Sequence, residues 1–202
     1  TIGGYGQVDY NQDLNSSASE NGKLDVHRMV MLFGYKFSNK TQFVTELELE
    51  HVKEVYVEQA FIDHQLLPNL SLRAGLMLVP MGLTNLYHEP TAYLGVERPN
   101  LDSKIAPTTW REIGAGFAGR VPGISLKYEL YLMNGFNGYN GSGTFRGSDG
   151  LRKGRQKGAE SFMSSPTFAG RVSYFGLPGL QFGFSSYQGK SQSTMFDGLS
   201  ND

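Results

Sequence analysis

In residues 70–78, Leu-Ser-Leu-Arg-Ala-Gly-Leu-Met-Leu, an apolar side chain occupies every second position. Residues 126–132, Leu-Lys-Tyr-Glu-Leu-Tyr-Leu, repeat the pattern, with Lys127 and Glu129 on the opposite parity. Successive side chains of a β-strand point to opposite faces of its sheet, so a two-residue period predicts a strand with one apolar face. We therefore expect both segments to be β-strands that present one continuous apolar face.

The same period recurs along the whole chain and predicts an all-β fold. It appears in nine segments: residues 2–10, 24–37, 42–50, 55–64, 70–78, 112–119, 124–133, 167–174 and 180–187. One piece, residues 151–162, is a candidate for a short helix, although its glycines disfavour helix formation. The sequence thus predicts nine strands in a single domain that covers residues 1–202.

The connections between these segments alternate in length. Short connections carrying Pro, Gly or Asn lie at 38–41, 65–69, 120–123 and 175–179, and long polar ones lie at 11–23, 79–111 and 134–166. The connection at 51–54 is an exception, because it is short where a long one is due. Outer-membrane barrels have short turns on the periplasmic rim and long loops outside, whereas a soluble sandwich does not sort its loops in this way. The pattern favours a transmembrane antiparallel up-and-down β-barrel whose first strand runs outward.

The composition agrees with this fold and excludes other classes. The chain has 26 Gly, 11 Tyr and 13 Phe, and its mean hydropathy is only −0.33; both suit strands with one lipid-facing side. No run of roughly 18 apolar residues predicts a transmembrane helix. The absence of Cys excludes a disulfide scaffold, and the net charge of −1 gives no reason to expect a nucleic-acid partner.

Several motifs resemble those of the phosphate-selective porin O and P family. They lie in order between residues 55 and 189: Glu-Gln-Ala-Phe at 58–61, the strand and Val-Pro-Met-Gly-Leu at 69–83, Val-Glu-Arg-Pro-Asn at 96–100, Arg-Glu-Ile-Gly at 111–114, Tyr-Leu-Met-Asn-Gly at 131–135 and Gly-Arg-Val-Ser-Tyr at 170–174. Residues 87–90 and 107–112 are similar to porins of Bacteroidota. The resemblance implies a bacterial outer-membrane channel in contact with lipid and lipopolysaccharide, with a homotrimer as one allowed assembly.

Nine strands are an odd number, whereas single-chain bacterial barrels have even numbers. Barrels of the porin O and P family, which the chain resembles, have about 16 to 18 strands, a size that leaves an aqueous channel. We therefore interpret the chain as the N-terminal half of a longer barrel. The alternative is a small complete barrel of about eight or ten strands.

If the apolar parity faces lipid, the other parity faces the lumen and carries charges of both signs. The pore-lining candidates on the strands are Arg28, Glu46, Glu48, Glu58, Arg73, Glu112, Lys127, Glu129 and Arg171, and Asp9, Glu50 and Lys36 share their parity. Phosphate selectivity needs rings dominated by Arg and Lys. Because the two signs nearly balance, the solute stays open. We expect Glu46, Glu48 and Glu50 to pair with basic residues on neighbouring strands.

The connection at 79–111 is much longer than ordinary loops and contains four prolines, which stiffen it. Such a loop either folds into the lumen as a constriction, with Glu97 and Arg98 as further pore-lining residues, or forms an outer lid. The basic run at 146–157 is expected to be a solvated surface loop, the alternative being an entrance that attracts anions.

Enzymatic function finds no support. His27, His51, His64 and His88 are isolated along the sequence, and zinc-protease, serine-hydrolase and phosphate-loop motifs are absent. We predict no enzyme activity, cofactor or metal. The leading hypothesis is a porin for passive diffusion of small hydrophilic solutes or ions, supported by small residues at Gly75, Gly114, Gly116 and Gly183. Alternatives are an outer-membrane scaffold or adhesin with a plugged lumen, and a soluble ligand-binding β-barrel.

Overall fold

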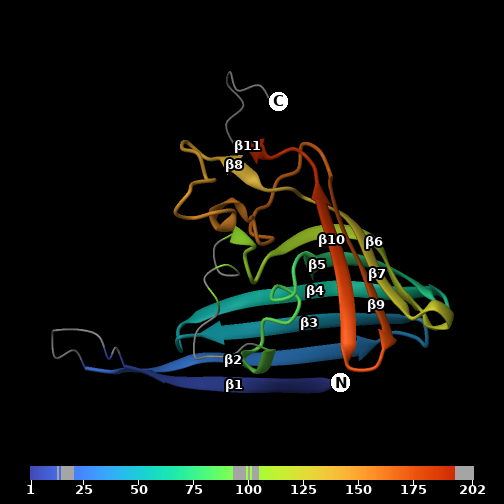
Figure 1. Ribbon diagram of the computed structural model, residues 1–202, viewed down its shortest axis with the longest axis horizontal. Coiled ribbons are helices and arrows are strands. Elements are labelled where there is room, and N and C mark those ends of the chain that lie inside the picture. The colour runs from blue at the N-terminus through green and yellow to red at the C-terminus, as the bar shows by residue number, and fades with distance from the viewer. Residues whose placement is uncertain (13, 15–20, 93–98, 100, 102–104, 194–202) are drawn as a thin grey trace.

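The computed structural model describes residues 1–12, 14, 21–92, 99, 101 and 105–193. Nine strands form one antiparallel sheet in the order β1-β2-β3-β4-β5-β6-β7-β9-β10 (Figure 1). Their bounds are β1 Ile2–Asn11, β2 Lys23–Lys36, β3 Thr41–Glu50, β4 Glu54–Leu67, β5 Leu70–Leu78, β6 Arg111–Val121, β7 Leu126–Met133, β9 Thr167–Leu177 and β10 Leu180–Gln188. A small parallel pair, β8 (Asn137–Tyr139) with β11 (Gln192–Ser193), lies beyond one end of the sheet.

All nine predicted strands are confirmed, with corrections at their ends. The connections predicted at 65–69 and 175–179 are too long, because β4 continues to Leu67 and β9 to Leu177, which leaves two residues for each turn. The helix considered at 151–162 is also wrong: the structure has only a three-residue 3₁₀ helix, η4 (Arg152–Gly154). Two further 3₁₀ helices are η1 (Pro90–Ala92) and η3 (Pro122–Ile124). None of the helices in the described residues has the length and apolarity to cross a membrane.

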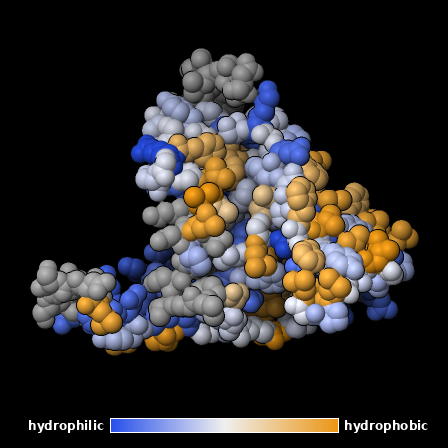
Figure 2. All heavy atoms as spheres, viewed as in Figure 1, coloured by the Kyte–Doolittle hydropathy of each residue, from blue (hydrophilic) through white to orange (hydrophobic). Residues whose placement is uncertain are grey.

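The sheet curls, and the described parts of the chain between β5 and β6 and between β7 and β9 return to its concave side (Figure 1). The two faces differ in chemistry. On the convex face Ile113, Phe117 and Leu132 are 46%, 45% and 55% exposed, whereas on the concave face Glu112 is fully buried and Glu129 is 7% exposed. Figure 2 shows apolar side chains gathered at the surface on the right of the view, over β6 and β7. The sheet therefore buries charge and exposes apolar groups.

A compact apolar cluster attaches the returning loops to the concave face. Trp110, just before β6, stacks on Phe136 with ring centroids 4.5 Å apart and contacts Tyr187 of β10 at 4.7 Å. Met77 of β5 and Met133 of β7 belong to the same buried cluster. Because its members come from strands and loops alike, this cluster fixes where both long connections lie.

Glycines on the concave face do not leave open space. A Cβ atom at Gly116 would lie 2.1 Å from the carbonyl oxygen of Leu130, and one at Gly183 would lie 2.6 Å from the Arg171 guanidinium. Gly116 also pairs in register with Arg73 and Tyr131 of the two adjacent strands. These glycines permit close approach of neighbouring backbone and large side chains, so small size here is not by itself a sign of a wide lumen.

Gly116→Ala should lower the free energy of unfolding by about 1–3 kcal/mol, the usual cost of forcing an atom into packed structure. The reason is the approach of the new Cβ to the β7 backbone, which cannot rotate away as a side chain could. Gly123→Ala is the matched control, because no heavy atom lies within 4 Å of a Cβ there. Urea titration in detergent measures both variants, and equal midpoints would contradict the close approach.

Candidate functional site

Charged side chains on the concave face pair across neighbouring strands. Arg28 Nη1 of β2 lies 3.0 Å from Glu48 Oε1 of β3, with both side chains at most 2% exposed, and Arg28 Nη2 lies 3.9 Å from Glu50. The predicted pairing of these two glutamates with a basic neighbour is confirmed. For Glu46 it is wrong, because its carboxylate accepts a 2.8 Å hydrogen bond from the Gln59 amide.

Glu58 enters the concave face through a register shift. Glu46 pairs with Gln59 and Leu47 with Val57, so Glu58 is an extra residue in β4 and is buried. Arg111, the first residue of β6, donates from Nη1 to Glu58 Oε1 at 2.6 Å. His88 of the long loop places Nε2 4.0 Å from Glu58 Oε2. The shift thus brings a carboxylate to the point where β4, β6 and the loop meet.

A second group of charges is centred on Arg73 of β5. Its Nε donates to Asp63 Oδ2 of β4 at 2.6 Å, and its Nη1 lies 3.7 Å from Glu129 Oε1 of β7. Lys127 approaches the same Glu129 oxygen at 3.5 Å. The Arg73 guanidinium also lies over the Phe61 ring, 5.5 Å from its centroid. Arg73, Lys127 and Glu129, three of the pore-lining candidates, therefore lie together on the concave face.

Glu112 and Arg171, two further pore-lining candidates, hold loops against the sheet. Glu112 accepts hydrogen bonds from Asn134 Nδ2 at 2.6 Å and from the Gln156 backbone N–H at 2.9 Å. Arg171 Nη1 donates to the Gly82 carbonyl at 2.5 Å. Both lie on the predicted face, but their polar atoms are engaged with the loops.

The long connection between β5 and β6 lies against the concave face at two places, Gly82 beside β9 and His88 beside β4. Asn85 fixes its base, because Asn85 Nδ2 donates to the carbonyls of Val79 and Trp110 while Asn85 Oδ1 accepts from the Trp110 N–H at 2.8 Å. These contacts favour the inward placement. Glu97 and Arg98 lie outside the described residues.

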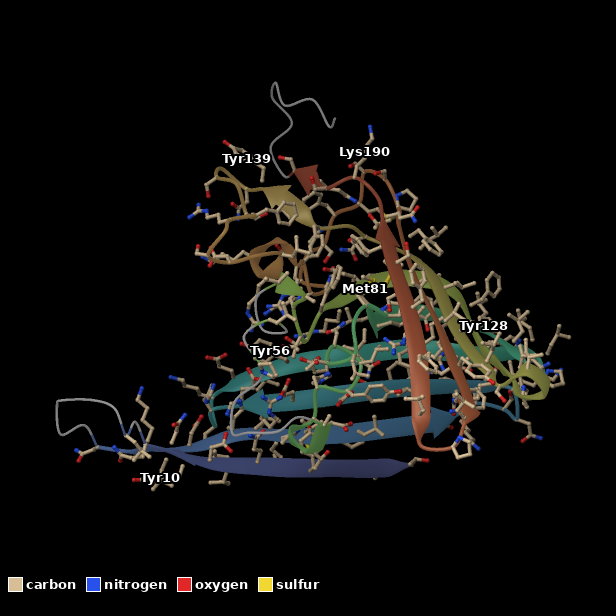
Figure 3. All side chains as sticks on the ribbon, in the orientation of Figure 1. Tyr10, Tyr56, Met81, Tyr128, Tyr139 and Lys190 are labelled. Atoms are coloured by element: carbon tan, nitrogen blue, oxygen red, sulfur yellow. The ribbon has the colours of Figure 1, made fainter. Side chains whose placement is uncertain are left out.

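A polar cavity of about 240 Å³ lies between an acidic wall and basic side chains. Its lining comprises Glu48, Glu50, Glu54, Tyr56, Glu58, Thr109, Arg111, Arg152 and Lys157. Arg111 and Lys157 both lie over the ring of Tyr56, a β4 residue that Figure 3 labels, each 5.7 Å from its centroid. A solute in this cavity would meet both signs of charge.

The basic run at 146–157 is not the fully solvated loop that we expected. Arg155 Nη1 donates to the Thr108 carbonyl at 2.5 Å and to Thr109 Oγ1 at 2.9 Å. Burial lowers the pKa of Arg155, and the nearby charges of Arg152 and Arg111 lower it further. Burial, followed by the charges of Arg155 and Arg111, also lowers the pKa of Lys157. The end of this run therefore adds positive charge to the concave side of the sheet.

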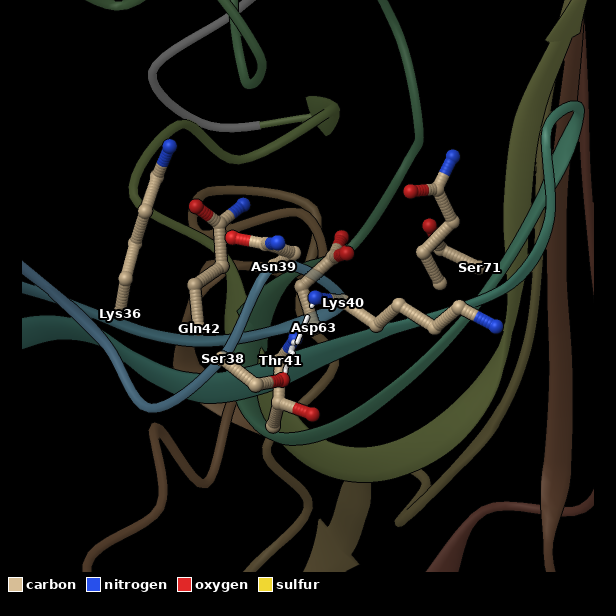
Figure 4. A pocket seen from close by; sticks show the side chains of 9 residues that line it. Lys36, Ser38, Asn39, Lys40, Thr41, Gln42, Asp63 and Ser71 are labelled. Carbon is tan, nitrogen blue, oxygen red and sulfur yellow. Dashed lines mark hydrogen bonds between the residues drawn. The ribbon is translucent and has the colours of Figure 1, made fainter.

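A second polar hollow, of about 150 Å³, lies where the short β2–β3 turn meets β4 and β5 (Figure 4). Lys36, Gln42, Asp63 and Ser71 contribute to its lining. Ser38 Oγ closes the turn by accepting hydrogen bonds from the backbone N–H groups of Lys40 and Thr41 at 3.2 and 3.1 Å. Polar lining thus continues along the concave face to the rim with short turns.

Two of the histidines that are isolated along the sequence lie close together in the structure. The rings of His27 and His51 have centroids 5.4 Å apart, and each imidazole contacts an aspartate. Sequence spacing gave no sign of this cluster, because β2 and the turn after β3 bring the two residues together only through strand pairing. Asp9 lies on β1, and Asp25 lies on β2, the strand that also holds His27.

Comparison with known proteins gives one distant similarity and no function. No family model matches the chain, and no solved structure matches it. The chain is 36% identical over 182 residues to an uncharacterized protein of Aquifex aeolicus (strain VF5), an alignment that covers 86% of this chain and 40% of that protein. The chain thus spans about 40% of the length of the relative it matches.

Glu58→Gln should lower the free energy of unfolding by about 3–5 kcal/mol, because it leaves the Arg111 guanidinium buried without its anion. Removing both charges in a Glu58→Gln/Arg111→Gln double variant should recover part of that loss. Lys153→Gln is the control, since Lys153 is 60% exposed in its ion pair with Asp149 and such pairs contribute little. A urea midpoint for Glu58→Gln equal to that of Lys153→Gln would contradict the importance of the buried pair.

Proposed function

We propose that the chain forms part of the wall of an outer-membrane β-barrel porin, through which small hydrophilic solutes or ions diffuse passively. The observation that carries this proposal is the distribution of side chains on the sheet, with charges on the concave face and apolar groups on the convex face. Its concave face holds the buried pairs Arg28–Glu48 and Arg111–Glu58, while its convex face exposes Leu, Ile and Phe. In water such a face is a large uncompensated apolar patch, whereas in lipid it is the favourable arrangement.

The sheet edges support a larger barrel. In the described part of the chain, β1 and β10 each pair with one neighbour only. An unpaired strand edge in lipid leaves backbone groups without partners, so membrane sheets close on themselves. The chain spans about 40% of its relative, which leaves ample length for further strands. We propose a barrel of about 16 to 18 strands, the number implied by the resemblance to the porin O and P family.

Aromatic side chains near the strand ends suit the two membrane interfaces. Tyr10, close to the long-loop rim, is 58% exposed, and Tyr35 and Phe37, close to the short-turn rim, are 64% and 61% exposed. Tyr35 and Phe37 contact each other edge to face with centroids 5.0 Å apart. Aromatic girdles occupy these levels in outer-membrane barrels. We accordingly propose contacts with lipid and lipopolysaccharide.

The mixed charge of the inner face favours weak selectivity. Acidic Glu48, Glu50, Glu54 and Glu58 line the same cavity as Arg111, Arg152 and Lys157. Selectivity for one sign needs rings dominated by that sign. The proposed solutes are therefore small and hydrophilic, with no strong preference for phosphate or any other single anion.

A scaffold or adhesin with a plugged lumen is the second candidate, favoured by one observation. The long loops are packed onto the concave face by the buried cluster of Met77, Trp110, Phe136 and Tyr131, and Arg171 holds Gly82 there. If those loops fill the lumen of the whole protein, transport would be blocked. Conductance separates the two candidates.

Leu72→Arg and Leu130→Arg should each cost roughly 2–4 kcal/mol in folding into lipid bilayers, because both residues lie on the apolar convex face. Leu72 and Leu130 are each 38% exposed there. Ser71→Arg, on the opposite parity, is the matched control and should be mild. The measurement is folding free energy in vesicles, and equal tolerance at Leu72 and Ser71 would rule out lipid on the convex side.

The complete protein should conduct ions in planar bilayers, and deletion of residues 86–104 should raise single-channel conductance. The deletion keeps Asn85 and Trp110, which fix the base of the loop, and removes the segment that includes Glu97 and Arg98. Neutralising Arg98 should shift the reversal potential in a salt gradient toward cation preference, and neutralising Glu97 toward anion preference. If neither the complete protein nor the deletion variant conducts ions, the scaffold or adhesin function is favoured. If the deletion leaves conductance unchanged, the loop is an outer lid.

A further inference from the structure

Two imidazoles and two carboxylates meet where the end of β1 and the start of β2 lie beside the turn after β3. His27 Nδ1 is 2.9 Å from Asp9 Oδ2, and His51 Nδ1 is 2.5 Å from Asp25 Oδ2. The two rings have centroids 5.4 Å apart and planes inclined by 51°. This His–Asp cluster takes no part in the buried ion pairs described above.

Strand pairing builds the cluster on the concave side. Gln7 pairs with the inward-facing Arg28, and Asp9, two residues further along β1, pairs with Asp25 after a register shift. The shift leaves an extra residue in β2 and allows His27 to reach Asp9. Gln7 Nε2 holds Asp9 through both carboxylate oxygens, at 3.0 and 2.9 Å. The backbone N–H of His51 donates to the His27 carbonyl at 3.2 Å, which fixes the two histidines relative to each other.

We propose that His27 and His51 bind one divalent transition-metal ion, of the Zn²⁺ class, through their Nε2 atoms. A hydrogen bond from Nδ1–H to a carboxylate keeps the proton on Nδ1 and leaves the Nε2 lone pair for a metal. Histidine ligands commonly have such a carboxylate behind them. Two imidazoles bound to one tetrahedral ion at about 2.0–2.1 Å place their ring centroids roughly 5 Å apart, close to the separation observed here.

The site is open rather than a closed cage. In the described residues, no group of three or more His, Cys, Asp or Glu is arranged to hold a metal ion. The protein therefore supplies two nitrogen ligands, and water completes the coordination. Imidazole favours Zn²⁺, Cu²⁺ and Ni²⁺ over Ca²⁺ and Mg²⁺, which prefer oxygen. His51 is 43% exposed and Asp25 36% exposed, so an ion can reach the site from solvent.

Calorimetric titration of the complete, tag-free protein with ZnCl₂ tests the site. We expect one ion per chain at about pH 7.5, and weaker binding in more acidic solution, because protons compete with the metal ion for the ligand nitrogens. His27→Gln and His51→Gln should each weaken binding at least about tenfold, and Asp9→Asn or Asp25→Asn about 10- to 100-fold. His64→Gln is the control, because His64 Nδ1 is hydrogen-bonded to Thr41 elsewhere on the sheet.

A second measurement does not depend on the folding of any variant. Co²⁺ bound to the unmodified protein should give the visible absorption of a tetrahedral ion, and Zn²⁺ should displace it while Ca²⁺ should not. Zinc binding that survives the His27→Gln/His51→Gln double variant, or that is lost in His64→Gln, would overturn the site. The absence of both binding heat and Co²⁺ absorption would also overturn it.

Discussion

Pairing of buried charges on the concave face is the constraint on which the other features of the molecule depend. An unpaired charge removed from water is strongly destabilising, so each buried guanidinium needs a carboxylate within reach. The buried Arg28 pairs with Glu48 and the buried Arg111 with Glu58, while the partly exposed Arg73 pairs with Asp63. Each pair joins two different strands, and the Arg111–Glu58 pair joins strands that are not neighbours in the sheet. The charges therefore fix both the register and the curl.

The same constraint determines where the long connections lie. Glu112 accepts hydrogen bonds from Asn134 and Gln156, and Arg171 donates to the Gly82 carbonyl in addition to Ser173 and Ser185 on the strands. The loops are thus part of what makes burial of these strand charges tolerable. Apolar packing of Trp110 against Phe136 and Tyr187 stabilises the same arrangement. The concave side of the sheet is therefore occupied by loops rather than empty.

Two register shifts supply the chemistry that regular alternation would not allow. One leaves Glu58 as an extra residue in β4, where it meets Arg111 and His88. The other leaves an extra residue in β2, where His27 meets Asp9. An extra residue re-aims one side chain without breaking the rest of the ladder, which is why such irregularities accompany functional positions. Both the mixed-charge cavity and the His–Asp cluster arise in this way.

The sequence by itself determined the nine long strands and which face of each is apolar, because the two-residue period is a local property of extended backbone. Residues 70–78 show this clearly, and the concave placement of Arg28, Glu48 and Arg73 follows from the same parity. Only the tertiary structure decided the ion-pair partners, the inward return of the loop at Gly82 and His88, the short β8–β11 pair, and the contact of His27 with His51. These depend on register and on packing between residues distant along the chain, for which local periodicity carries no information.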